Sequence, residues 1–193
     1  MRIIIEGCDG CLKTTIAKQL GSRLVYPIIK ESVPKLVNGE TNLQYYLRRC
    51  EELPQDCVVD RFHLGESVYP YVKNDGRTAL TLPQVQEIDR KLLDTSKKGC
   101  ALILCSSSYD WRKYVWDTRG ETFITLEQSE VVKKSFEFAY IVSLLRPTYR
   151  FYVDDYLHTG LNKMIKPVVE ETEFVEKTLS DLKNIWNLIE EYK

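Results

Sequence analysis

The residues best suited to chemistry lie near the start of the chain, in the segment Glu6-Gly-Cys-Asp-Gly-Cys-Leu-Lys-Thr-Thr15. Small residues let such a loop turn its backbone N–H groups inward, toward phosphate oxygens, and a helix N-terminus adds positive potential. Lys13 would reach the β- and γ-phosphates of a nucleotide, and Thr14 would offer its hydroxyl to Mg²⁺. The residues that we predict to bind the nucleotide are Gly7, Cys8, Asp9, Gly10, Cys11, Leu12, Lys13, Thr14 and Thr15.

The flanking sequence supplies the strand and the helix that such a loop requires. Residues 3–5 form a continuous β-branched run, which is typical of a strand buried on both faces. From Thr15 onward the apolar residues Ile16, Ala17 and Leu20 follow helical spacing. Strand, loop, Lys-Thr pair and helix together are the layout of a phosphate-binding P-loop.

Leu12 is the one departure from the P-loop pattern, which has glycine immediately before the lysine. A side chain at this position would crowd the nucleotide or tilt the loop. The sequence therefore leaves two interpretations, a working nucleotide loop or a degenerate loop that keeps the fold and binds weakly.

A second group of charged residues follows other predicted strands. Residues 57–59 read as a short buried strand that delivers Asp60 and Arg61 at its carboxyl end. A carboxylate there can hold Mg²⁺ or its water, and a guanidinium can bind phosphate through two hydrogen bonds. Glu31 follows a predicted strand at 24–29 and lies where open α/β sheets place ligand groups. The alternative for Asp60 and Arg61 is a surface salt bridge.

Aromatic and polar side chains near these positions are candidates for an acceptor pocket. A helix predicted at 42–53 carries Tyr45 and Arg48, and the segment after Arg61 carries further candidates. The alternative is ordinary helix packing. The residues predicted to bind the acceptor are Glu31, Tyr45, Arg48, Phe62, Glu66 and Tyr69.

The remaining pattern alternates helices and strands, which predicts an α/β fold with a doubly wound, mostly parallel five-stranded sheet. We predict strands at 100–105 and 149–153 and helices at 80–96, 128–145 and 170–192. The polar segment at 109–125 would act as a lid over the phosphates. Its alternative is a solvated charged helix.

Composition limits the protein class. The chain has 193 residues, 44% of them apolar and 28% charged, which predicts one soluble domain spanning 1–193. The net charge of −1 gives no general cationic excess for holding a polyanion. No apolar run approaches the ~20 residues that a membrane span needs. Because the chain begins with its first strand, we expect no signal peptide and a cytoplasmic protein.

Two of the six cysteines, Cys8 and Cys11, form a C-x-x-C pair inside the predicted loop. A zinc site would need a second pair of ligands, and no other C-x-x-C or H-x₃-H follows. We expect reduced cysteines that bind no metal.

With these motifs in place, the chain resembles the thymidylate kinase family of nucleoside monophosphate kinases. The segment 6–15 matches the family's P-loop at every fixed position except Leu12. The family's Asp-Arg-aromatic motif looks like residues 60–62, and the tyrosine that follows it looks like Tyr69. Gly65 and Glu66 replace the usual serines, as in divergent phage and viral members. Glu31 resembles the glutamate that follows the family's second strand. Arg112 and Arg119 resemble the family's lid arginines.

The resemblance implies ATP- and Mg²⁺-dependent phosphoryl transfer to a deoxynucleotide, namely thymidylate or a modified pyrimidine deoxynucleoside monophosphate. It implies that Thr14 and Asp60 hold the metal and that Glu31 positions or deprotonates the acceptor. It also implies a possible homodimer. The residues implied to be catalytic are Lys13, Asp60, Arg61, Arg119 and Glu31.

Two alternatives remain open. Similar phage proteins phosphorylate 5-hydroxymethyluracil within DNA, which the altered segment at 65–66 allows. The departure at Leu12 instead allows a nucleotide-binding protein without catalytic activity.

Overall fold

The computed structural model describes residues 1–37, 39–73, 76–119 and 124–154. The predicted helix at 170–192 lies outside these ranges. Within them, no helix combines the length and the apolar character that crossing a membrane would require.

The described residues form a five-stranded sheet in the order β2-β3-β1-β4-β5. All four strand pairings are parallel. The strand bounds are Arg2–Gly7 for β1, Ile28–Lys30 for β2, Cys57–Asp60 for β3, Cys100–Ser106 for β4 and Thr148–Tyr152 for β5. The predicted α/β fold with a mostly parallel five-stranded sheet is therefore confirmed.

The central strands are made of side chains that suit complete burial. Every residue of β1, β3 and β4 is buried, and the runs are rich in Ile, Val and Leu. The parallel register places Ile5 opposite Asp60 and Gly7 opposite Cys105. The carboxyl ends of β1, β3 and β4 therefore meet at one edge of the sheet, where open α/β sheets bind ligands.

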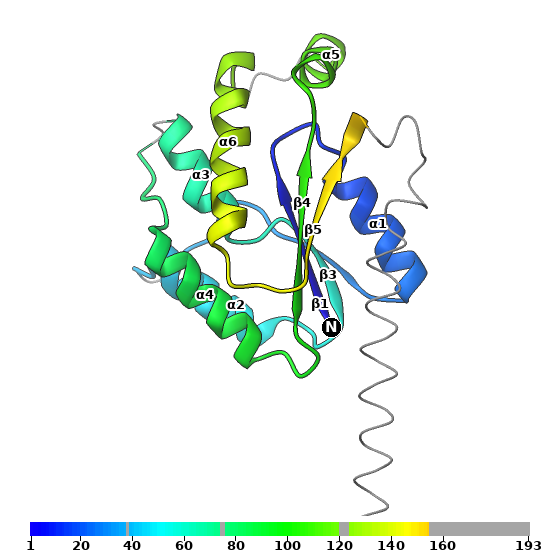
Figure 1. Cartoon of the computed structure of the whole chain (residues 1–193). Helices are drawn as coiled ribbons and strands as arrows, with labels where there is room; N and C mark the ends of the chain where they lie inside the picture. Colours follow the sequence, from blue (N-terminus) through cyan, green and yellow to red (C-terminus); the bar gives the residue numbers. More distant parts are fainter. Residues whose placement is uncertain (38, 74–75, 120–123, 155–193) are drawn as a thin grey trace, which may run out of the picture.

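Helices pack on both faces of this sheet (Figure 1). Helix α1 covers one face, while α2, α3, α4 and α6 lie together on the other, and α5 lies beyond the carboxyl end of β4. Capping boxes begin α2 and α6, where Thr41 and Thr125 accept hydrogen bonds from the backbone three residues later. The helix bounds are Lys13–Leu24 for α1, Asn42–Glu52 for α2, Leu64–Lys73 for α3, Leu82–Asp94 for α4, Tyr109–Arg119 for α5 and Leu126–Val142 for α6.

One predicted strand is wrong over most of its length. The apolar run at 24–29 predicted a strand, but α1 continues through Leu24 and only Ile28–Lys30 pairs with β3. Val25 ends the helix in a left-handed conformation, with φ of 57°. Strand β2 is the edge strand of the sheet, which suits the preceding Pro27 because proline has no N–H to donate to a neighbouring strand.

Gly7 lets the chain leave β1 against the neighbouring strand. Its φ is 139°, and a Cβ atom there would lie 2.0 Å from the Cys105 carbonyl oxygen. Gly99 also has a positive φ, of 81°, but a Cβ there would meet no atom within 4 Å. A side chain at Gly7 would therefore meet both a steric clash and an unfavourable backbone conformation, whereas a side chain at Gly99 would meet only the second.

We expect Gly7→Ala to lower the free energy of unfolding by about 3 kcal/mol or more, because it adds overlap to left-handed strain. The control Gly99→Ala should cost only about 1 kcal/mol. Urea unfolding of both variants measures the difference, and equal losses would contradict the close contact at Gly7.

Candidate active site

The predicted phosphate loop lies between β1 and α1, at the carboxyl edge of the sheet. Lys13 is only 4% exposed and begins α1. Its Nζ donates to the carbonyl oxygens of Gly7, at 2.8 Å, and Cys8, at 2.6 Å. The ammonium group is thereby held inside the loop, within reach of a ligand at the helix N-terminus. A cavity of about 170 Å³ is lined by Gly10, Cys11, Leu12, Lys13, Thr14, Thr15 and Arg61.

Leu12 adopts the backbone conformation for which glycine is suited. Its φ is 57° and its ψ is 17°, in the left-handed region. A β-carbon in this region costs roughly 1–2 kcal/mol. Leu12 therefore takes a glycine-like backbone conformation, and its side chain packs partly against the core.

Thr14 and Asp60 meet across the end of the sheet. The Thr14 hydroxyl donates to Oδ2 of Asp60 at 2.5 Å. Oδ1 of the same carboxylate is buried and has no hydrogen-bond partner among the described residues. A hydroxyl and a buried carboxylate oxygen suit the ligand preference of Mg²⁺, which also keeps several waters. These two residues therefore fit a Mg²⁺ site.

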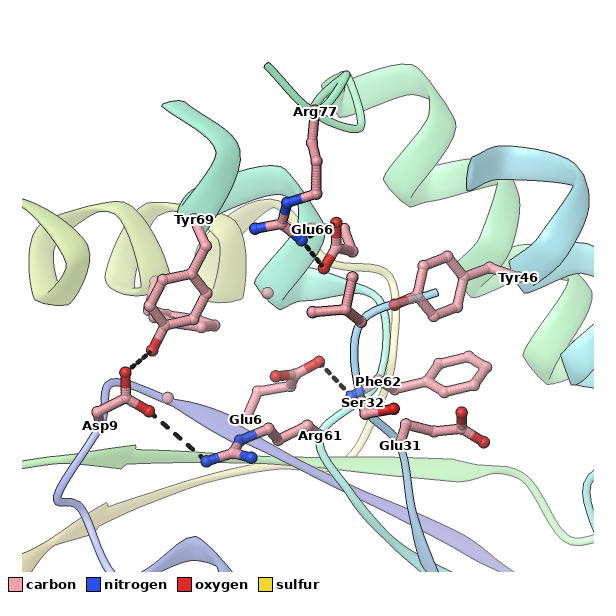
Figure 2. A pocket seen from close by; sticks show the side chains of 14 residues that line it. Glu6, Asp9, Glu31, Ser32, Tyr46, Arg61, Phe62, Glu66, Tyr69 and Arg77 are labelled. Atoms are coloured by element: carbon pink, nitrogen blue, oxygen red, sulfur yellow. Dashed lines mark hydrogen bonds and ion pairs between the residues drawn. The ribbon is translucent and has the colours of Figure 1, made fainter. Parts of the chain in front are cut away.

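Arg61 lines both this small cavity and a larger neighbouring one. Its backbone is left-handed, with φ of 69°, and its N–H donates to the Ile5 carbonyl oxygen at 2.9 Å. Its Nη2 lies 3.5 Å from Oδ1 of Asp9 (Figure 2). Arg61 is thus the charged side chain that the two cavities share.

Glu6 and Tyr69 hold the residues around Arg61. Oε1 of Glu6 accepts from the N–H groups of Phe62, at 2.8 Å, and Leu64, at 3.0 Å. Burial raises the pKa of the Glu6 carboxyl, and His63 and these amides oppose the rise. The Tyr69 hydroxyl donates to Oδ2 of Asp9 at 3.0 Å, and burial raises the pKa of this hydroxyl.

The larger cavity, of about 350 Å³, has the size of a small-ligand site. Figure 2 shows aromatic side chains and carboxylates facing each other across it. Its lining residues include Glu6, Asp9, Glu31, Ser32, Tyr46, Arg61, Phe62, Glu66, Tyr69, Arg77 and Phe136.

The structure brings Glu31 to this cavity with its charge already paired. Arg49 binds Oε1 of Glu31 through Nε, at 3.1 Å, and through Nη2. The Tyr45 hydroxyl donates to Oε2 at 3.1 Å, so Tyr45 supports Glu31 from outside the cavity lining. Arg48 points elsewhere, because its guanidinium pairs with Glu40 and Glu52.

Arg77 and Phe136 also line the cavity, although no motif in the sequence marks them. Arg77 donates from Nη1 to both carboxylate oxygens of Glu66, at 2.9 and 3.0 Å. Arg77 follows α3 in a segment without a motif, so no sequence signal identified it. Phe136 lies on α6, in a segment for which the sequence predicted only a helix. Tyr46, beside Tyr45 on α2, lines the cavity, whereas Tyr45 does not.

The two arginines of the predicted lid occupy α5. Arg112 is fully buried, and its Nη1 donates to the Ser107 carbonyl oxygen at 2.5 Å. Its Nε donates to Ser129 at 3.1 Å, and Nη2 forms an ion pair with Glu130. Arg112 therefore joins α5 to α6. Arg119 is the last residue of α5, and its side chain lies outside the described part of the structure.

The two loop cysteines contact each other through their sulfur atoms, which lie 2.9 Å apart. The Cys11 sulfur also lies 3.2 Å from the Ser107 hydroxyl. The hydrogen bond from Cys8, with Lys13 and Ser107 nearby, lowers the pKa of the Cys11 thiol. These contacts tie the phosphate loop to the end of β4.

The chain matches no known protein-family model. Over 97 residues it is 33% identical to the SPbeta prophage-derived protein YorR of Bacillus subtilis. This stretch covers 49% of the chain and 57% of YorR, little more than half of that relative's length.

Solved structures define the fold more fully. The crystal structure of YorR from Bacillus subtilis in complex with phosphorylated GDP has a TM-score of 0.71 and 24% identity, over 88% of this chain and 96% of that one. Deoxyadenosine kinase from M. mycoides with bound dCTP has a TM-score of 0.57 and 20% identity, over 90% of this chain and 99% of that one. Polyphosphate kinase 2 from Arthrobacter aurescens has a TM-score of 0.58 and 11% identity, over 78% of this chain and 59% of that one. The chain therefore has the fold of the P-loop nucleotide kinases.

The strain at Leu12 can be measured by comparing two substitutions. Leu12→Gly and Leu12→Ala both remove the side chain's packing, but only glycine relieves the left-handed backbone. We expect Leu12→Gly to be the more stable variant by about 1 kcal/mol, as measured by urea unfolding. Equal stabilities, or a more stable alanine variant, would contradict the left-handed conformation.

Proposed function

We propose that this protein is a nucleotide kinase, which transfers a phosphoryl group from ATP to a deoxynucleotide in a Mg²⁺-dependent reaction. The observation that carries the proposal is that Arg61 lines both the phosphate-loop cavity and the larger aromatic cavity beside it. This arrangement suits phosphoryl transfer, which needs donor and acceptor held side by side and is helped by a positive charge at the transferred group. The proposed place of action is the cytoplasm, of a host cell if the protein is viral.

On the donor side, the loop N–H groups and Lys13 bind the phosphates of ATP. Lys13 exchanges its two loop carbonyl partners for phosphate oxygens, which are stronger acceptors. Thr14 and Asp60 hold Mg²⁺, which neutralises charge on the phosphates when bound. Arg61 stabilises the negative charge that develops on the transferred group, and Arg119 is proposed to assist it.

On the acceptor side, the aromatic side chains of the larger cavity stack on the base. Glu31 positions the acceptor, and its pairing with Arg49 and Tyr45 fixes the direction of its carboxylate. Glu66 and Arg77 supply an acceptor and a donor of hydrogen bonds beside the aromatic walls.

The proposed acceptor is thymidylate or a modified pyrimidine deoxynucleoside monophosphate, as the resemblance to thymidylate kinases implies. The cavity's size supports a single nucleotide rather than a polymer. An acceptor panel should also contain guanine and cytosine nucleotides, because the similar structures hold phosphorylated GDP and dCTP. The panel also includes DNA that contains 5-hydroxymethyluracil. Separately, analytical sedimentation tests the homodimer that the resemblance implies.

The activity is tested with labelled ATP and this panel. We expect label on a monophosphate, and we expect Lys13→Met to lower the transfer rate at least ~10²-fold, since it removes the charge but keeps the buried methylenes. The control Lys18→Met changes an exposed lysine of the same helix and should leave the rate unchanged. Label only on modified DNA would replace the proposed acceptor. ATP binding without any transfer would instead make the protein a nucleotide-binding protein.

The metal assignment has its own test. Asp60→Asn keeps an acceptor for the Thr14 hydroxyl but removes the carboxylate charge. We expect the Mg²⁺ concentration for half-maximal activity to rise at least about tenfold, since Mg²⁺ prefers carboxylate ligands. Asp94→Asn, an exposed change at the end of α4, is the control. An unchanged Mg²⁺ dependence in Asp60→Asn would remove Asp60 from the metal site.

A further inference from the structure

Helix α5 contacts the phosphate loop directly, through a side chain that no P-loop motif contains. The indole Nε1 of Trp111 donates to the carbonyl oxygen of Gly10 at 3.0 Å. Val115, one turn later on the same helix, packs against the same residue, because a Cβ atom on Gly10 would lie 3.2 Å from its Cγ1.

The base of α5 is itself fixed, so Trp111 is a rigid support. Oδ2 of Asp154 accepts from the Ser108 N–H at 2.8 Å, and the Ser108 hydroxyl accepts from the Trp111 N–H at 3.1 Å. Arg112 joins the helix to Ser107, whose hydroxyl in turn contacts Cys11. The entry to the helix, at Ser107 and Ser108, and its first turn, at Trp111 and Arg112, are therefore tied to a residue that follows β5 or to the phosphate loop.

The bond to Gly10 determines the direction of the next N–H group. The only cis peptide bond among the described residues is Arg146-Pro147, so the Gly10-Cys11 peptide is trans. In a trans peptide the C=O and the following N–H point in opposite directions. With the Gly10 carbonyl turned to Trp111, the Cys11 N–H faces away from α5. Trp111 does not line the small cavity, whereas Cys11 and Lys13 do.

We propose that Trp111 is a positioning residue, which holds the Gly10-Cys11 peptide so that the Cys11 N–H points at the phosphates of the donor nucleotide. Gly10 has φ of 78° and no side chain to restrain its carbonyl group, so the bond from Trp111 fixes the Gly10 side of this peptide, while the Cys8 and Ser107 contacts hold the Cys11 side chain. Leu12 adds strain two residues later, which makes outside support more important. The inference takes the identity of the donor, ATP, from the proposed function.

The chain offers a matched control on the same helix. Trp116 also donates from its indole Nε1 to a backbone carbonyl at 3.0 Å, but its acceptor is Ile124 rather than the phosphate loop. Trp111→Phe and Trp116→Phe therefore each remove one hydrogen bond of the same kind and length. Only the first of these bonds reaches Gly10.

Two measurements on both variants test the proposal. In hydrogen–deuterium exchange of the ligand-free protein, Trp111→Phe should speed exchange in the peptide spanning 7–14, and Trp116→Phe should not. The Kd for ATP should rise about three- to tenfold in Trp111→Phe, which is the range for one lost hydrogen bond, and change less than twofold in Trp116→Phe. Equal loop exchange and equal Kd in the two variants would overturn the proposal.

Thermal unfolding of each variant shows whether it is folded. If Trp111→Phe does not fold, Val115→Ala replaces it, since it removes the wall against Gly10 and should change exchange and Kd in the same direction. Unchanged exchange and Kd in Val115→Ala would then overturn the proposal. Failure of the proposed function is separate, because it would appear as absent phosphoryl transfer in the wild type while the exchange comparison still stands.

Discussion

The left-handed turn at Arg61 determines how the two cavities relate to each other. Its backbone leaves β3 with φ of 69°, and bonds to the Ile5 carbonyl and from Phe62 to Glu6 hold the turn on both sides. Such strain persists only where the surrounding structure enforces it. The turn sends the guanidinium to the boundary of the cavities instead of along the strand, and the proposed chemistry depends on that direction.

The site also solves an electrostatic difficulty. It contains buried carboxylates beside a cavity that is proposed to receive an anionic nucleotide. Glu31 and Glu66 are each paired with an arginine, Arg49 and Arg77, and Asp9 with Arg61. The pairing lowers the cost of burying these charges and leaves their oxygens fixed in direction. The cavity can therefore be polar without repelling a phosphate as strongly as free carboxylates would.

Local signals in the sequence predicted the fold well. The strand, loop and Lys-Thr pair at 3–14 are contiguous, and the apolar runs of β3 and β4 require no knowledge of tertiary structure. The strand at 24–29 was wrong over most of its length because α1 extends through Leu24 and ends at Val25, so that pairing with β3 begins only at Ile28, and apolar content alone does not show where a helix ends. The extent of the domain to residue 193 stays a prediction.

The candidate site was predictable only where residues adjoin a strand end. Asp60, Arg61 and Glu31 follow strands, and the parallel register brings them together. The sequence predicted Arg48 for the pocket, but Arg49 is the arginine that pairs with Glu31. Side chains of neighbouring residues on a helix point about 100° apart, so the orientation of α2 about its axis decides which of the two faces Glu31. Arg77 and Trp111 reach the site through tertiary packing, which spacing along the chain does not reveal.

The central claim is that the two cavities hold donor and acceptor with Arg61 between them. A bisubstrate ligand, adenosine joined to a deoxynucleoside through five phosphates, tests it most directly. The account predicts that the thymidine form, or the form carrying the nucleoside found in the acceptor panel, binds at least ~10²-fold more tightly than ATP, because linking the two halves makes the second binding event intramolecular. Binding no tighter than that of ATP for every nucleoside tried would contradict the account.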